Sequence, residues 1–360
     1  MRRRQLLGGL AAGALLGAGG SAWHITRSRQ GMLVSCVRKT SGGYAVVAFD
    51  PVTAEVYWDC LLPARGHAIA VSPGGDHLAV FARRPGQWVW IIAAQDGRLL
   101  RTLAVPNKAQ FNGHGLFAAD GQQVWVSATS YATHGQPRGE ILQFDWGRAR
   151  LEQRWSSAGL DPHECALHGD CLVVANGGYA EQYANGDDKR LVAEQPPNLA
   201  WLDAATGGVK RIDTLADPKL SIRHLDVGPQ GVFVGFQHAD GPLAQTPLLG
   251  RARSNGPLVM LEPPVEGWEA WYGYVLSVHL QANKGQVLAT SPRSGRMGVW
   301  DALSGAALQS RPLADVSGVA AQGDSWWASS GHGVIAGASQ ERYLMPNWQF
   351  DNHMVAIPRA

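Results

Sequence analysis

The sequence predicts an all-β fold, a seven-bladed β-propeller, from three observations. First, one pattern recurs along the 360 residues: an alternating strand, a Gly/Pro/Asp turn and a second apolar run, which together indicate a two-stranded hairpin. Second, an apolar residue followed by Asp and a small-residue turn recurs between later strands, as at Phe49-Asp50, Leu202-Asp203 and Trp300-Asp301. Third, the units repeat every ~40–50 residues, which is the period of propeller blades.

Six complete units follow one another along the chain. In the first unit we expect strands over 67–71, 78–82, 88–94 and 98–104, because each of these runs is apolar and bounded by turn residues. The inner strands of the next five units are predicted to begin at His114, His163, His224, Ser277 and Ser317.

The seventh blade is predicted to be divided between the two ends of the chain. Three apolar runs over 32–37, 44–50 and 56–61 form a meander that has no leading inner strand. Residues 353–357 look like an inner strand without its partners. Pairing of the two ends would close the ring and remove the last open sheet edge. We therefore expect one propeller domain over residues 31–360.

The first 22 residues are predicted to be a signal peptide of the twin-arginine type. Arg3 and Arg4 precede Leu6 and Leu7, and a Gly/Ala/Leu run of weak apolar character follows. An ordinary secretory signal and an uncleaved anchor are the alternatives. Residues 23–30 form a short polar lead, and the mature chain is expected to be periplasmic and monomeric.

Two classes of partner are excluded by composition. The net charge is +2, and the basic residues do not cluster beyond the N-terminus, which argues against nucleic acid as a partner. No other stretch is long and apolar enough to cross a membrane, so no span is expected in the mature chain.

The spacing of the four cysteines fits no zinc or haem-attachment motif. Cys165 and Cys171 are expected on paired strands of one hairpin. An oxidising compartment permits a disulfide between them. Four separate thiols are equally compatible with the sequence.

Five of the seven inner strands are marked by a histidine near their start. Equivalent positions in a propeller converge on the central axis, so these imidazoles should form an arc at one mouth of the channel. Neutral imidazole binds iron, copper and zinc. We therefore predict a transition-metal site, with iron or copper as the expected ion. The predicted ligands are His67, His114, His163, His224 and His353.

Polar residues around these histidines are predicted to support them as a second shell. They are Arg65, Asn112, Asp161, Glu164, Arg223, Asp226, Asp351 and Asn352. The connections over 130–139, 176–198 and 237–256 are long and are expected to lie over the same mouth. These connections carry Tyr131, His134, Tyr179, Tyr183 and His238.

Two other uses of the mouth stay open. The Gly66-His67 and Gly113-His114 pairs resemble the structural Gly-His pair of WD-type propellers, which would make the protein an interaction scaffold. Here, however, the histidine lies close to the hairpin turn, at the start of the strand. The third reading is an enzyme, a hydrolase or an oxidoreductase, although no P-loop, nucleophile elbow or His-Glu-x-x-His motif is present.

The His-marked strands, the twin-arginine start and the ending Asn352-His353-x-x-Ala356-Ile357 resemble a bacterial family of exported propellers, a domain of unknown function. Genes of that family often lie beside imelysin-like iron-uptake proteins and a di-haem oxidoreductase-like protein. The resemblance covers the whole mature chain. It implies a periplasmic location, a link to iron or copper handling, and envelope iron-uptake proteins as partners. It implies no particular reaction.

Overall fold

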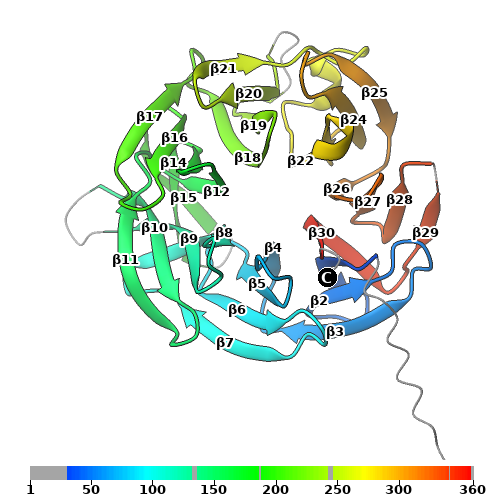
Figure 1. Ribbon diagram of the computed structural model, residues 1–360, viewed down its shortest axis with the longest axis horizontal. Coiled ribbons are helices and arrows are strands. Elements are labelled where there is room, and N and C mark those ends of the chain that lie inside the picture. The colour runs from blue at the N-terminus through cyan, green and yellow to red at the C-terminus, as the bar shows by residue number, and fades with distance from the viewer. Residues whose placement is uncertain (1–30, 132–135, 186–187, 242–245, 340, 358–360) are drawn as a thin grey trace, which may run out of the picture.

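The computed structural model describes residues 31–131, 136–185, 188–241, 246–339 and 341–357, with the backbone alone for 182–190. Within these residues, seven four-stranded antiparallel sheets stand around a central axis (Figure 1). This confirms the predicted seven-bladed propeller. The predicted signal peptide, polar lead and final three residues lie outside the described part of the chain.

Blades one to three follow the predicted units closely. Blade one contains β4 (Gly66–Val71), β5 (His77–Ala82), β6 (Trp88–Ala93) and β7 (Leu99–Ala104). Blade two contains β8 (Ala109–Phe117), β9 (Gln123–Ser130), β10 (Arg138–Asp145) and β11 (Arg150–Ser156). Blade three contains β12 (Pro162–His168), β13 (Cys171–Asn176), β16 (Asn198–Asp203) and β17 (Val209–Thr214).

Blades four to six complete the continuous part of the ring. Blade four contains β18 (Leu220–Gly228), β19 (Gly231–His238), β20 (Leu249–Arg253) and β21 (Gly256–Met260). Blade five contains β22 (Ser277–Gln281), β23 (Gln286–Ser291), β24 (Arg296–Asp301) and β25 (Ala307–Pro312). Blade six contains β26 (Val316–Gln322), β27 (Ser325–Ser330), β28 (Val334–Gly337) and β29 (Arg342–Leu344).

The seventh blade joins the two ends of the chain. Its inner strand is β30 (Trp348–Ala356), followed outward by β1 (Leu33–Lys39), β2 (Tyr44–Phe49) and β3 (Val56–Leu62). Leu33 pairs with Ala356, and Lys39 pairs with Trp348 at the other end of the ladder. Figure 1 shows the blue and red ends of the chain meeting in this blade. The predicted closure of the ring is confirmed.

Burial changes from the inner to the outer strands because the blades stack face to face. The first five residues of β1 are all buried, which explains why four of them are apolar and only Ser35 is polar. The outer strand β17 alternates between exposed and half-buried residues. Trp271 and Trp300, both fully buried, belong to a core cluster that extends over blades three, four and five. Each fully buried large apolar side chain stabilises the fold by about 1.5–3 kcal/mol.

The connections after the second strands are long in three blades, as predicted, although one bound is wrong. The 176–198 connection contains a hairpin of β14 (Tyr179–Asn185) and β15 (Asp188–Glu194). The predicted 237–256 connection ends earlier, because Leu249–Arg253 forms the third strand of blade four and the following turn leads into the fourth. This strand packs against Phe236 of the second strand. That contact lies between strands, so the sequence of the segment alone did not distinguish a strand from a loop.

The four cysteines are free thiols. Cys165 pairs in register with Val174, and Cys171 pairs with His168, so the two cysteines do not face each other across the hairpin. The described part of the chain contains two short helices, η1 (Trp268–Trp271) and η2 (Ala282–Lys284), each about one turn long. In the described ranges, no helix has the length and apolar character needed to cross a membrane.

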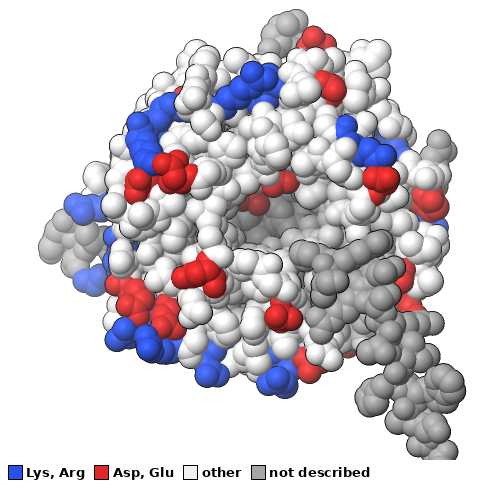
Figure 2. All heavy atoms as spheres, in the orientation of Figure 1, with Lys and Arg blue, Asp and Glu red and all other residues white. Residues whose placement is uncertain are grey.

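The centre of the ring is hollowed on the face drawn in Figure 2. The charged atoms visible inside that hollow are acidic. Glu164 and Asp226, on the inner strands of blades three and four, are 27% and 29% exposed. Carboxylates therefore accompany the inner strands that carry His163 and His224.

Candidate metal centre

A β-bulge directs each of the five histidines. The ladder between the first and second strands shifts register between Gly66 and Ile69 in blade one, and between Ile222 and His224 in blade four. Equivalent shifts accompany the other three histidines. The inner strand has one extra residue at this point in blades one, three and four and two extra residues in blades two and seven, and such insertions turn side chains away from the regular alternation. A bulge therefore accompanies each imidazole at the point where it faces the central axis.

The five imidazoles form one cluster at the hub. The ring centre of His114 lies 4.3 Å from that of His163, 4.8 Å from His67, 4.9 Å from His353 and 5.5 Å from His224. His224 and His353 are also 5.0 Å apart, although blades five and six separate them in the ring. The predicted arc is thus closed into a compact group with His114 in contact with all four others.

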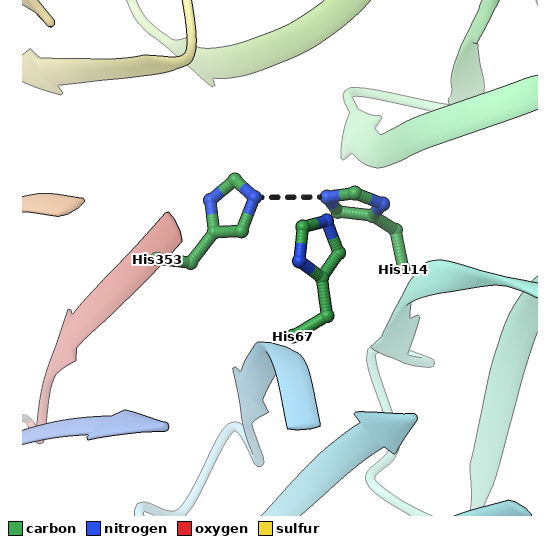
Figure 3. A group of neighbouring side chains, drawn as sticks. All are labelled: His67, His114 and His353. Atoms are coloured by element: carbon green, nitrogen blue, oxygen red, sulfur yellow. Dashed lines mark hydrogen bonds between the residues drawn. The ribbon is translucent and has the colours of Figure 1, made fainter. Parts of the chain in front are cut away.

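The nitrogens of the cluster lie at distances suited to shared coordination. His114 Nε2 and His353 Nε2 are hydrogen-bonded at 3.1 Å, and the two rings point toward one another beside His67 (Figure 3). Because metal–imidazole bonds are about 2.0–2.1 Å, two nitrogens on one ion are separated by about 3.0–3.4 Å. The observed distance therefore fits two ligands of one ion.

Two histidine triads in the cluster each have ligand atoms within 4.8 Å of one another, and they share His114. The first triad is His67, His114 and His353, and the second is His114, His163 and His224.

Two carboxylates contact the Nδ1 atoms of two cluster histidines and orient their rings. Asp351 Oδ1 is 3.4 Å from His67 Nδ1, and Glu164 Oε2 is 3.3 Å from His224 Nδ1. A carboxylate accepts the Nδ1–H proton, so the lone pair of each ring is on Nε2. This is the arrangement in which imidazole binds a metal. Both carboxylates were among the predicted supporting residues.

In contrast, two other nitrogens of the cluster are buried without a hydrogen-bond partner among the described residues: Nδ1 of His114 and Nδ1 of His163. Leaving a buried polar atom unsatisfied costs about 1–3 kcal/mol. His238 behaves differently, although it is equally buried: its Nδ1 accepts the backbone N–H of Asp240 at 3.2 Å, and its Nε2 donates to Asp217 at 3.0 Å. Unlike His238, His114 and His163 therefore each keep a buried ring nitrogen without a hydrogen bond among the described residues.

Electrostatics keep the cluster neutral. Burial lowers the pKa of all five imidazoles, to about 4 in His353 and about 3 in His224. The positive charge of Arg223 further lowers the pKa of His163 and His224. Neutral imidazole is the metal-binding form, so the cluster is ready to bind an ion at neutral pH. Burial also raises the pKa of Glu164 to about 7.

The remaining predicted supporting residues tie neighbouring blades together. Asn112 Nδ2 donates to the carbonyl of Pro162 at 2.8 Å, directly before His163. Asp226 lies 3.1 Å from His279 Nδ1 and accepts the backbone N–H of Leu280, so it joins blades four and five instead of contacting the cluster.

Arg65 and Asp161 hold ion pairs beside the cluster. Arg65 Nε is 2.5 Å from Asp351 Oδ2. Buried Asp161 contacts both Arg84 and Arg223, the latter at 3.0 Å from Nη1. Asn352 lines a cavity next to the histidine cluster.

A cavity of about 300 Å³ opens over the histidines. His67, His163 and His224 lie in its wall. Several other lining residues were not predicted from the sequence. They are Arg83, Arg84, Glu181, Gln237, Tyr274 and Arg293. The Arg83-Arg84 pair directly after an apolar strand was the only signal that could have suggested them.

The predicted loop residues contribute less to the site. Tyr131, Tyr179 and His238 are not among the residues that line this cavity. The Tyr131 hydroxyl donates to the Glu181 carbonyl at 2.6 Å and so attaches the β14–β15 hairpin to blade two. His134 and the side chain of Tyr183 lie outside the described residues.

Comparison with known families fits this architecture. Residues 60–357 match the family model described as Protein of unknown function (DUF1513). The chain belongs to the DUF1513 family. This confirms the resemblance to a domain of unknown function seen in the sequence, whereas twin-arginine export and the gene neighbours of the DUF1513 protein stay predictions.

Solved structures share the fold with the DUF1513 chain. The hydrazine synthase of Kuenenia stuttgartiensis matches with a TM-score of 0.58 at 14% identity, covering 79% of this chain and 86% of that chain. The structure described as the Dos1 propeller matches with a TM-score of 0.53 at 15% identity, covering 88% of this chain and 77% of that chain. At these identities the similarity shows the propeller fold alone. No curated protein matches the chain at a significant level.

Proposed function

We propose that this DUF1513 protein binds a transition-metal ion, iron or copper, at the hub of the propeller. The ligands would come from the cluster of His67, His114, His163, His224 and His353. One observation carries the proposal: five buried, neutral imidazoles from five blades converge so that two Nε2 atoms are 3.1 Å apart. A cluster of all-nitrogen donors suits iron, copper and zinc, and the binding order of divalent ions favours copper.

The proposed role is metal uptake or redox handling in the periplasm, with envelope iron-uptake proteins as partners. The sequence supports this role through the twin-arginine start and through the context of the resembling family. The cluster supports it through its chemistry: imidazole holds iron and copper in more than one oxidation state. Iron or copper is therefore preferred over zinc for this protein.

Elemental analysis tests the metal. Full-length protein purified after expression with export, and also reconstituted with iron or copper, is compared with the variant H67A/H114A/H353A. We expect about one bound ion per chain in the wild type and loss of most of it in the variant. The control is H238A, whose histidine is buried but has both nitrogens hydrogen-bonded.

Equal iron and copper contents in the wild type and the triple variant would refute the proposal. Circular dichroism shows whether the triple variant keeps its sheets. A variant that unfolds is replaced by H67Q/H353Q, which retains polar side chains of similar size.

A metal-dependent enzyme at the same mouth is the second candidate. The cavity of about 300 Å³ over the imidazoles favours it, because a substrate could reach the cluster there. An oxidoreductase or hydrolase would show activity that is lost on chelation and restored by adding the ion. An interaction scaffold would instead keep its partner binding after chelation.

A further inference from the structure

Four arginines from three blades surround the mouth of the histidine cavity. Arg83 and Arg84 follow β5 in blade one, Arg223 lies at the start of β18 in blade four, and Arg293 lies in the turn before β24 in blade five. All four line the cavity that contains His67 and two other cluster histidines. Segments far apart in the sequence thus place guanidinium groups around one opening.

Two carboxylates among the described residues contact these guanidinium groups. Asp161 contacts Arg84 and Arg223 and holds these two like charges side by side. Glu181 Oε2 is 3.7 Å from Arg84 Nη2. The described residues that line the cavity thus bring four guanidinium groups together with the carboxylate of Glu181, and this lining carries more positive than negative side chains.

This charge is unexpected above a cation site. The five imidazoles are neutral, and positive side chains nearby weaken the binding of a dication through Coulomb repulsion. Asp351 supplies negative charge next to His67 but is already paired with Arg65 at 2.5 Å, and burial raises the pKa of Glu164 to about 7, so that this group is only partly ionised at neutral pH. An anion in the cavity would offset both the guanidinium groups and the bound ion.

We propose that the cavity binds a small oxyanion with at least two charged oxygens, such as inorganic phosphate or a polycarboxylate. Guanidinium groups bind such oxygens in pairs of hydrogen bonds. Gln237, Tyr274 and Asn352 add polar groups to the same wall, and the volume of about 300 Å³ limits the ligand to a small molecule. A bound oxyanion would direct one oxygen toward the histidines. That last part, contact between the anion and the ion, rests on the proposed function.

Calorimetric titration of the metal-free, full-length protein tests the anion site. Inorganic phosphate and citrate are titrated separately, so that an inorganic and an organic source of the same chemistry are distinguished. The variant is R83Q/R293Q, which removes two exposed arginines of the mouth and keeps the two that Asp161 holds. The control is R98Q/R148Q, which removes the same charge from arginines that are 68% and 74% exposed on outer turns.

We expect saturable binding of at least one of the two anions by the wild type, with affinity at least ~10-fold weaker in R83Q/R293Q and unchanged in R98Q/R148Q. Absence of saturable binding of both anions would overturn the proposal. Equal weakening in both double variants would also overturn it, because the effect would then be one of net charge alone.

Copper electron paramagnetic resonance separates this proposal from the proposed function. Adding phosphate to the copper-loaded wild type should change the copper spectrum, and the change should be lost in R83Q/R293Q. If the metal-free protein binds phosphate and the spectrum does not change, contact with the ion is refuted and the anion site stands. If the protein binds phosphate and no copper or iron, the metal proposal fails by itself.

Discussion

His114 is the residue on which the cluster depends most. It belongs to both histidine triads, and its ring contacts all four other imidazoles. Its backbone carbonyl also accepts the Ser127 hydroxyl at 3.0 Å, which fixes the bulge that directs the ring. A change at this position therefore affects every arrangement of ligands that the cluster allows.

We predict that H114A lowers metal affinity more than any other single change in the cluster, by about 100-fold or more, compared with about 10–100-fold for H224A. Competition with a chromophoric chelator measures both affinities. The matched variant H238A should destabilise the fold and leave metal affinity unchanged. Equal affinity losses for H114A and H238A would show that the effect comes from general loosening of the fold.

Gly113 controls the position of a neighbouring ring. Its φ is +94°, and a Cβ added there would lie 2.8 Å from Cδ2 of His67. Gly42 has a similar φ of +99° but nothing within 4 Å of its added Cβ. The two glycines therefore separate backbone strain from contact with the cluster.

We predict that G42A and G113A both lose stability, by about 1–2 kcal/mol from the unfavourable φ. Only G113A should also bind metal more weakly, because its methyl group displaces the His67 ring. Thermal unfolding and metal titration measure the two effects. The interpretation is contradicted if the two variants bind metal equally well.

At the scale of the element, the bulged start of an inner strand carries both a histidine and its support. In β30, Asp351 and His353 lie between two ladder pairs, Phe350 with Val37 and Met354 with Ser35. Asp351 crosses to His67 in blade one, and Ser35 Oγ donates to the His353 carbonyl at 2.7 Å. One strand thus holds its own histidine and orients the histidine of the next blade.

We predict that D351N lowers metal affinity by about 10–100-fold, because asparagine accepts the Nδ1–H of His67 less strongly than a carboxylate does. Isothermal titration with copper measures the change. The control is D59N, which removes a surface ion pair with Lys39 that contributes little. A loss of affinity in D59N equal to that in D351N would assign the effect to overall charge.

At the scale of the whole molecule, ring closure collects the buried histidines and makes stability sensitive to acid. Their pKa values are lower in the folded protein than the value of about 6.5 in the unfolded chain. The unfolded state therefore binds more protons below that pH. The contribution of these neutral histidines to the free energy of unfolding is fully present above about pH 6.5. It is lost as the pH falls toward the folded-state pKa, which is about 4 for His353 and about 3 for His224.

We predict that the metal-free protein loses stability steeply between pH 6.5 and 5, by about 1.4 kcal/mol per pH unit for each fully coupled histidine. The raised pKa of Glu164, about 7, acts in the opposite direction but involves a single group. Urea unfolding at several pH values measures the slope, and H353Q should reduce it. A stability that is constant or rises on acidification would contradict this prediction.

The sequence by itself determined the architecture of the protein. Blade number, strand order and the pairing of residues near 33 with those near 356 followed from a repeating pattern. Such a pattern is local: alternation, turn residues and period are all read within one unit. The equivalent placement of the five histidines followed for the same reason, because each occupies the same position of its unit.

Only the tertiary structure decided how the site is built. The bulges, the 5.0 Å approach of His224 to His353 and the carboxylates behind two rings arise from contacts between blades. The ring of arginines over the cavity has the same origin. Such contacts depend on how neighbouring sheets stack and twist around the axis, and no pattern within a single unit records them. The sequence therefore determines which residues reach the hub, and the packing of blades determines what they meet there.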